Sequence, residues 1–282
     1  SGKYGRLTVD SSILPLVEDT VRTGRTFVGG PGSTTMHLAE ATWTDADDLE
    51  TDLALLPTGS TEQHGPHAPM GTDALSAETI ASEAAARFDG EVVVAPTVAV
   101  GVSEEHRHFT GSLWVSEDTF RSYIRDTVAS LASHGWERVV VVNGHGGNTD
   151  ALREVCGAIT RQDDAYALPW TWFDALDFEE YGVDLGHGGP AETAFVQAVR
   201  SDLVREERFD EAATGAGDAF GEFEQGSNLA YDFAEFSETG NIGDPSDGDA
   251  QLGEQLLADA TESLVALLET VSERDMTRPA HR

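Results

Sequence analysis

Short runs of apolar residues alternate along the chain with longer segments in which apolar residues recur at helical spacing. Residues 53–56, 92–94 and 139–142 are almost wholly apolar, which is typical of strands buried on both faces of a sheet. A weaker strand is expected over residues 165–170. Because a helical segment separates each strand from the next, the pattern predicts a three-layer α/β/α fold with a mainly parallel sheet.

The main helical segments are expected over residues 74–88, 116–133, 149–161 and 252–271. Ser116 and Asn148 stand at the starts of two of them, and both residue types cap helices by accepting a hydrogen bond from a backbone N–H group. Residues 205–250 are acidic and rich in glycine, so we expect long surface loops there. Residues 36–282 are interpreted as one domain. Residues 1–35 are interpreted as an N-terminal extension, either native or the product of an early start site.

The charge of the chain is strongly one-sided. Fifty-one acidic residues outnumber 17 basic ones, which gives a formal net charge of −34, and Lys3 is the only lysine. The acidic residues are spread through amphipathic segments, which favours a solvated surface adapted to a salt-rich cytoplasm, where repulsion between like charges is screened. A surface of this sign disfavours nucleic acid and anionic lipid as partners.

Cysteine content and hydropathy narrow the class of protein further. Cys156 is the only cysteine, so neither an intrachain disulfide nor a cage of several thiolates around a metal is expected. No apolar run approaches the ~20 residues that a membrane span needs, and no secretory signal is visible. We therefore expect a cytoplasmic protein without a membrane partner.

The most informative polar segment follows the first predicted strand. Residues 59–73 read GSTEQHGPHAPMGTD, and they place Glu62, His64 and Asp73 in one predicted loop. Two carboxylates and an imidazole offer oxygen and nitrogen ligands, which suit zinc, manganese or iron. Ligands in open α/β sheets bind at the carboxyl ends of the strands, where this loop is expected. The sequence therefore predicts a metal site that other strand-end loops complete.

Further polar motifs follow the other predicted strands and precede the next helices. They are residues 105–112 (EHRHFTGS), 143–148 (NGHGGN) and 187–193 (HGGPAET). Together with residues 59–73, these motifs resemble those of the creatininase (creatinine amidohydrolase) family, in the same order and over about residues 37–270. The resemblance implies a three-layer α/β fold, two divalent metal ions (Zn, Mn or Fe), a homo-oligomer such as a hexamer, and hydrolysis of an amide-type C–N bond.

The resemblance also implies roles for single residues. The residues that match metal ligands are Glu62, His64, Asp73 and His145, with Glu192 as the expected fifth. Asp73 matches the carboxylate that bridges the two ions. His187 matches the histidine that transfers a proton to the departing nitrogen, a role that suits an imidazole because its pKa lies near neutrality. Glu192 is also expected to take part in catalysis.

The residues expected to face the substrate are Ser103, Glu105, His106 and Trp170. One departure from the family bears on which substrate this is. Creatininase itself has a metal-binding glutamate at the position of Gly147, so here that ligand has to come from elsewhere. The NGHGGN form and the Glu105–His106 pair favour the family members that do not act on creatinine.

The leading hypothesis is a dinuclear-metal hydrolase that acts on a small, non-peptide amide, such as a creatinine-like cyclic amide. Two other substrates stay open within the family: a formamide on a pyrimidine nucleotide precursor, and a peptide bond in the precursor of a redox cofactor (mycofactocin maturation). A non-catalytic, metal-binding assembly subunit is the alternative from a different class. The presence of both His187 and Glu192 speaks against that alternative.

Overall fold

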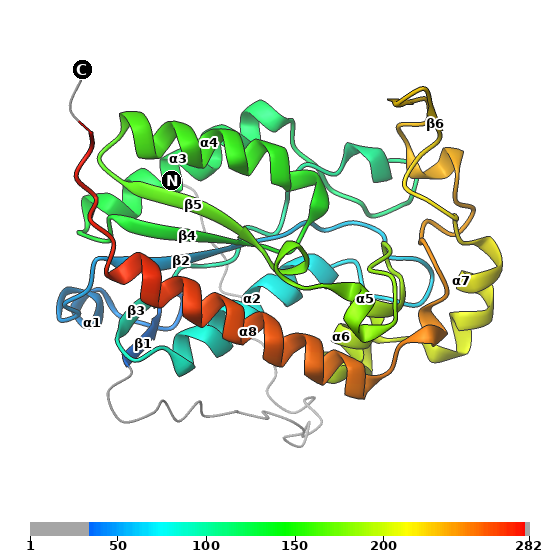
Figure 1. Cartoon of the computed structure of the whole chain (residues 1–282), viewed down its shortest axis with the longest axis horizontal. Helices are drawn as coiled ribbons and strands as arrows, with labels where there is room; N and C mark the ends of the chain where they lie inside the picture. The colour runs from blue at the N-terminus through cyan, green and yellow to red at the C-terminus, as the bar shows by residue number, and fades with distance from the viewer. Residues whose placement is uncertain (1–33, 280–282) are drawn as a thin grey trace, which may run out of the picture.

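A parallel sheet forms the centre of the structure, a computed structural model that describes residues 34–279 (Figure 1). In spatial order its strands are β1 (Thr34–His37), β3 (Glu91–Val94), β2 (Leu53–Thr58), β4 (Arg138–Asn143) and β5 (Tyr166–Thr171). Each neighbouring pair is parallel. The sheet begins at Thr34, slightly before the domain boundary expected at residue 36, and the rest of the expected extension lies outside the described residues.

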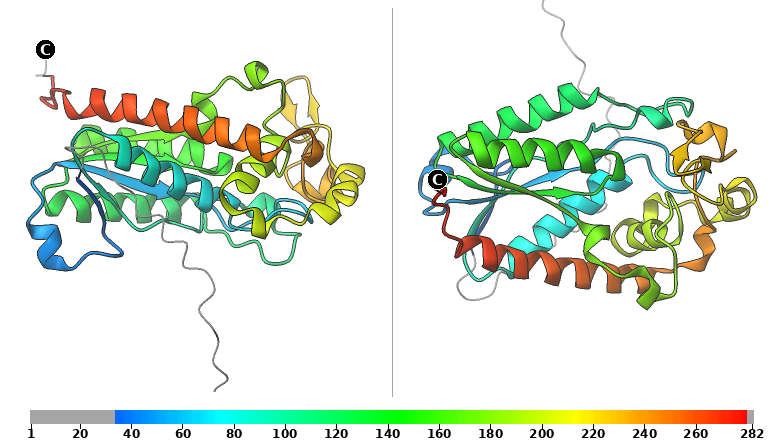
Figure 2. Two further views of the ribbon diagram at one scale, coloured as in Figure 1. Left: turned by 90° about the horizontal axis from the view of Figure 1, so that it is seen from below. Right: turned by 45° about the horizontal axis from the view of Figure 1, so that its top comes forward.

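Helices cover both faces of this sheet, which confirms the predicted three-layer fold (Figure 2). The long helices are α2 (Thr72–Arg87), α3 (Glu117–Ser133), α4 (Thr149–Gln162), α6 (Pro190–Arg200) and α8 (Ala250–Ser272). Helices α2, α6 and α8 pack on one face, and α3 and α4 on the other. The remaining elements are α1 (Trp43–Asp47), α5 (Phe178–Tyr181), α7 (Phe209–Gly215) and a hairpin of β6 (Phe223–Glu224) and β7 (Ser227–Asn228).

The valines of β4 show why this strand is apolar throughout. Val140 and Val142 belong to the core under α2 and α8, whereas Val139 and Val141 belong to the core under α3 and α4. Successive side chains of a strand point to opposite faces, so a strand covered on both sides has no position that favours a polar residue. Burying each valine contributes on the order of 1.5–3 kcal/mol before entropy is counted.

The two predicted caps differ in outcome. Ser116 caps α3 as predicted, because its Oγ accepts a hydrogen bond from the Thr119 N–H group at 3.3 Å. The prediction for Asn148 is wrong. Its Oδ1 accepts from the Val102 N–H group at 2.9 Å and its Nδ2 donates to the Gly59 carbonyl at 3.1 Å. Asn148 ends a 3₁₀ turn and already has helical backbone angles, so its side chain is free to tie neighbouring strand-end loops together.

The prediction of surface loops over residues 205–250 is only partly right. The segment contains α7 and several 3₁₀ turns, one of which begins at Phe233. Phe233 is buried and stacks on the ring of His106, with 4.1 Å between ring centroids. Composition alone indicated solvent exposure, whereas Phe233 is one of the residues that attach the segment to the carboxyl edge of the sheet.

None of the helices within residues 34–279 has both the length and the apolar character required to cross a membrane.

The surface of the described residues carries the acidic excess. Many acidic side chains of α3 and α8 are exposed, as at Glu117, Asp118 and Glu262. Exposed carboxylates of like sign repel one another most strongly when little salt is present.

Dilution of salt is therefore expected to destabilise the protein. Lowering the ionic strength from 1 M to 0.1 M lengthens the Debye length from ~3 Å to ~10 Å, which restores repulsion among the carboxylates that make up the net charge of −34. The melting temperature should fall on dilution from molar KCl, and an equal change in sucrose osmolality serves as the control. A melting temperature independent of KCl would contradict the salt-adapted interpretation of the charge.

Candidate metal centre

Six of the predicted side chains meet at the carboxyl edge of the sheet. They are Glu62, His64, Asp73, His145, His187 and Glu192, and all are buried. Glu62 and His64 lie in the loop after β2, and His145 lies two residues after the end of β4. The prediction that Asp73 lies in that first loop is wrong, because α2 begins at Thr72. The first turn of a helix suits a carboxylate, since unpaired N–H groups make that end of the helix positive.

Asp73 divides these side chains into two halves. Its Oδ2 lies 3.2 Å from His145 Nδ1, and that nitrogen is also 3.2 Å from Glu62 Oε1. Its Oδ1 lies 2.9 Å from His64 Nε2, which is 3.6 Å from Glu192 Oε2. One carboxylate therefore faces two separate sets of ligand atoms, as the prediction of a bridging Asp73 requires.

Each half has the composition of a metal site. Within residues 34–279, three groups offer ligand atoms that all lie within 4.8 Å of one another: Glu62–Asp73–His145, His64–Asp73–Glu192 and Glu62–His64–His187. The first two groups share Asp73 and use oxygen and nitrogen atoms only. Such donors suit zinc, manganese and iron.

Backbone carbonyls fix which imidazole nitrogen faces the centre. His145 Nε2 donates to the Val102 carbonyl at 2.6 Å, and His64 Nδ1 donates to the Glu62 carbonyl at 3.1 Å. The opposite nitrogen of each ring is left with a lone pair that points at the carboxylates. Histidines that bind metals are held in this way, because the second N–H bond sets the tautomer and the orientation of the ring.

The carboxylates of the centre have oxygen atoms that the protein leaves unpaired. Both Oε atoms of Glu62 and Oδ2 of Asp73 are buried without a hydrogen-bond partner among the described residues. A buried carboxylate oxygen without a partner costs free energy that a protein rarely tolerates. Cations placed between these oxygens and the free imidazole nitrogens would satisfy them, so the residues fit a metal centre.

The electrostatics of the two imidazoles agree with this conclusion. Burial lowers the pKa of His64, but the charges of Asp73, Glu192 and Glu62 outweigh burial and raise the pKa to about 10. Burial likewise opposes the charges of Glu62 and Asp73 at His145, whose pKa ends well above its usual value. The site thus attracts positive charge at both halves, and a metal ion would take the place of the attracted proton.

His187 and His106 stand beside this centre and share one partner that the sequence did not single out. Gln63 Nε2 donates to His106 Nδ1 at 2.8 Å, while its backbone carbonyl accepts from His187 Nε2 at 2.6 Å. His187 therefore presents Nδ1 to the centre, 3.8 Å from Glu62 Oε1. The rings of His64, His187 and His106 follow one another with centroids 4.3 and 4.4 Å apart. Gln63 lies between Glu62 and His64 in sequence, and this position was the one sequence signal that it could contact the site.

The residues expected to face the substrate separate into two groups. Glu105 and His106 line a cavity of about 240 Å3 beside the centre, together with Phe220 and Phe233. Ser103 is fully buried instead, and its Oγ bonds with Ser60 Oγ at 2.7 Å. Its hydroxyl therefore holds two strand-end loops together.

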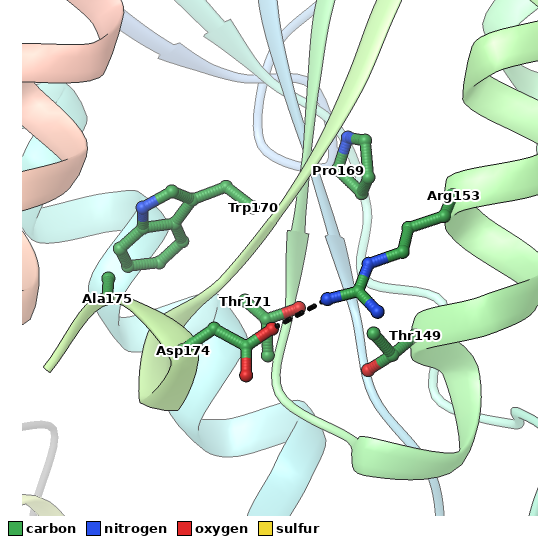
Figure 3. A pocket seen from close by; sticks show the side chains of 7 residues that line it. All are labelled: Thr149, Arg153, Pro169, Trp170, Thr171, Asp174 and Ala175. Atoms are coloured by element: carbon green, nitrogen blue, oxygen red, sulfur yellow. Dashed lines mark hydrogen bonds and ion pairs between the residues drawn. The ribbon is translucent and has the colours of Figure 1, made fainter.

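Trp170 belongs to β5 and borders another hollow, next to the start of α4 (Figure 3). Its indole lies on the opposite side of β5 from Arg153, which pairs with Asp174 at 3.3 Å, and it packs against the core under α2 and α8. Trp170 is not among the residues that line the cavity beside the metal centre. The structure therefore does not bring Trp170 together with Glu105 and His106.

Gly147 leaves no room for a side chain. A Cβ atom there would lie 2.2 Å from the Val102 carbonyl oxygen and 2.5 Å from His145 Nε2, the two atoms joined by the hydrogen bond that orients His145. The absence of a side chain is thus part of how this loop holds the imidazole.

Replacement of Gly147 by alanine is accordingly expected to weaken metal binding by roughly 10–100-fold, the usual effect of disturbing a partner of a metal ligand. Gly146→Ala is the matched control, because a Cβ atom at Gly146 has no neighbour within 4 Å. Chelator competition would measure both affinities. Equal affinities for the two variants would show that the His145–Val102 bond does not support the site.

The three-layer fold and this carboxylate–imidazole cluster define an α/β protein with a metal-binding centre. Comparison with known sequences then assigns the chain to a family. The sequence model described as "Creatininase: Creatinine amidohydrolase" matches residues 39–268, and the chain belongs to this family of hydrolases. The sequence-based identification is therefore confirmed.

Two similar proteins carry the names of different activities. The mycofactocin precursor peptide peptidase of Mycolicibacterium smegmatis is 33% identical over 212 residues, which is 73% of this chain and 80% of that protein. The creatinine amidohydrolase of Pseudomonas putida is 29% identical over 199 residues, 61% of this chain and 75% of that protein.

Among solved structures, a manganese form of creatininase matches with a TM-score of 0.73. The match covers 86% of this chain and 100% of that chain at 22% sequence identity, which supports the fold alone. Another similar structure is a mutant creatininase of the "Zn-Zn type".

Proposed function

We propose that the protein hydrolyses an amide C–N bond with the help of two divalent metal ions. The observation that carries this proposal is Asp73, whose two oxygens face two separate sets of ligand atoms. In this arrangement Glu62, Asp73 and His145 would hold one ion, and His64, Asp73 and Glu192 the other. Two such ions, when bound, polarise a carbonyl group and lower the pKa of a water molecule.

The chain's own residues would supply the proton that the departing nitrogen needs. His187 Nε2 is committed to the Gln63 carbonyl, so only Nδ1 can exchange a proton with groups in the cavity. Burial and the charges of His64 and His106 hold the pKa of His187 well below the near-neutral value expected from sequence, so Nδ1 has to take up a proton before it can pass one on. That nitrogen faces the centre, 3.8 Å from Glu62 Oε1. Glu192 would contribute to catalysis as a ligand, since its Oε2 is fixed by the Gly188 N–H group at 2.7 Å.

Within amide hydrolysis, we propose a peptide bond as the substrate. The identity of 33% to a peptide peptidase, with most of that protein covered, supports this choice. The cavity supports an uncharged reacting segment, because no arginine or lysine is among its lining residues within 34–279. An anionic nucleotide would find no counter-ion there, which argues against the formamide of a nucleotide precursor.

A creatinine-like cyclic amide is the second candidate, as the sequence analysis preferred. The cavity volume of about 240 Å3 favours a small substrate. The test is to load the protein with Zn or Mn and incubate it with creatinine and with a panel of acyl peptides, detecting released amine and acid. Cleavage of peptides alone supports the first proposal, and ring opening alone supports the second. Metal content without turnover of either would favour the assembly subunit.

A further inference from the structure

Glu105 lines the cavity beside the metal centre. Among the described residues, its carboxyl group belongs to none of the three candidate sets of metal ligands. It comes from the 3₁₀ turn Glu104–His106. Glu104 points to solvent and pairs with Arg107 at 3.3 Å, whereas His106 Nε2 lies 3.3 Å from Glu62 Oε1. Glu105 stands between these two in sequence; its side chain is 28% exposed, and its Oε1 lies 4.0 Å from His106 Nε2. It is therefore open to the cavity and close to the centre.

The missing side chain at Gly147 makes space for this carboxyl group. A Cβ atom at Gly147 would lie 2.9 Å from Glu105 Oε1, in addition to its closer contacts with Val102 and His145. Glu105 thus occupies the volume next to the NGHGGN loop that a larger residue would fill. It lines the same cavity as Glu62 and His145 but comes from a separate element.

The surroundings of Glu105 suit a group that gains and loses a proton. The cavity has no lysine or arginine to hold the carboxylate charged, and Phe220 and Phe233 form part of its wall. Burial, with smaller contributions from Glu62 and Asp232, outweighs the charge of His145 and raises the pKa of Glu105 to about 7. A carboxyl group that titrates near neutrality accepts and releases protons readily.

We propose that Glu105 is a catalytic residue that takes the proton of the attacking water. This inference rests on the proposed amide hydrolysis. As the water oxygen bonds to the carbonyl carbon, one water proton moves to the Glu105 carboxylate. That proton passes from Glu105 to Nδ1 of His187 and from there to the nitrogen as the C–N bond breaks, which leaves both side chains as they began. The products are a carboxylic acid and an amine, which exchange the last proton.

The test uses acyl peptides of the same sequence that carry either a 4-nitroanilide or a methylamide. Glu105→Gln should slow both by a similar factor, roughly 10²–10⁴, because the lost proton transfer belongs to the attack of water. His187→Ala should instead slow the methylamide more than the 4-nitroanilide, whose amine leaves more easily. Metal content of Glu105→Gln should equal that of the wild type. Glu104→Gln is the matched control on the same turn and should retain full activity.

A chemical rescue separates a proton acceptor from a structural residue. Glu105→Ala should regain activity as formate is added, since a small carboxylate can enter the space and accept the proton. Absence of rescue, loss of metal from Glu105→Gln, a defect confined to the methylamide, or full activity of Glu105→Gln would each overturn the inference. A wild type that cleaves no peptide of the panel would overturn the proposed substrate instead, which keeps the two failures distinct.

Discussion

Replacement of Asp73 by alanine is expected to remove both metal ions from the protein. Asp73 is the residue shared by the two halves of the centre, with Oδ1 2.9 Å from His64 Nε2 and Oδ2 3.2 Å from His145 Nδ1. Each half would keep one carboxylate and one imidazole, too few to hold a divalent ion against water. Elemental analysis after dialysis should find about two ions per wild-type chain and close to none in the variant.

Two further variants make this experiment specific. Glu192→Ala removes a carboxylate from the His64 half alone, so it should lose about one ion and keep the other. Glu78→Ala removes an exposed carboxylate from the same helix as Asp73 and should keep both ions. A chelator should lower the melting temperature of the wild type, because bound ligand stabilises the folded state, but not that of Asp73→Ala. Full metal occupancy in Asp73→Ala would exclude the dinuclear proposal.

Replacement of His187 by alanine is expected to slow turnover by roughly 10²–10⁴-fold while the metal content stays near that of the wild type. The two proposed ligand sets do not include His187, and its Nε2 is already bonded to the Gln63 carbonyl at 2.6 Å. The variant therefore loses a proton donor but keeps every ligand that the proposal uses. A substrate with a weakly basic leaving amine needs less protonation, so its defect should be smaller.

The measurement combines metal analysis with rates for both leaving groups in one preparation. His67→Ala is an informative comparison, because His67 is a buried imidazole nearby that bonds to Thr193 Oγ1 at 2.9 Å and is assigned no proton transfer. Its defect should not depend on the leaving group. Loss of metal from His187→Ala would instead make His187 a ligand, as the group Glu62–His64–His187 allows. An unchanged rate with metals in place would leave the imidazole a structural role.

The sequence predicted four strands of the sheet and the candidate centre because each depended on local signals, whereas the edge strand β1 (Thr34–His37) was not predicted. The valine run of β4 is buried on both faces, and its composition shows this directly. The candidate ligands Glu62, His64 and His145 follow strands whose carboxyl ends meet at one edge of a parallel sheet. Asp73 was predicted as a ligand but was placed in the loop and not in α2, since the glycine and proline before it do not mark the first helical residue.

Other features required the fold because they join segments far apart in sequence. Asn148 could cap a helix or bridge loops, and only the approach of Val102 and Gly59 decides between these roles. Phe233 lies in an acidic, glycine-rich stretch, and nothing in that stretch indicates that it stacks on His106. Trp170 lies near the carboxyl end of β5, but its indole packs against the core under α2 and α8 and does not face the cavity.

Hydrogen–deuterium exchange at one backbone amide of the loop around residue 240 can report on the order of the centre. The Ile242 N–H group donates to the His187 carbonyl at 2.7 Å, and the Gly240 carbonyl accepts from Gln63 Nε2 at 2.7 Å. Ile242 is not a member of any metal-ligating group found in the described residues. Its amide can exchange with solvent deuterium only when the His187 segment separates from it. The protection of the Ile242 amide therefore reports how ordered the loop that carries His187 is, with or without metal and in variants that have no activity to assay.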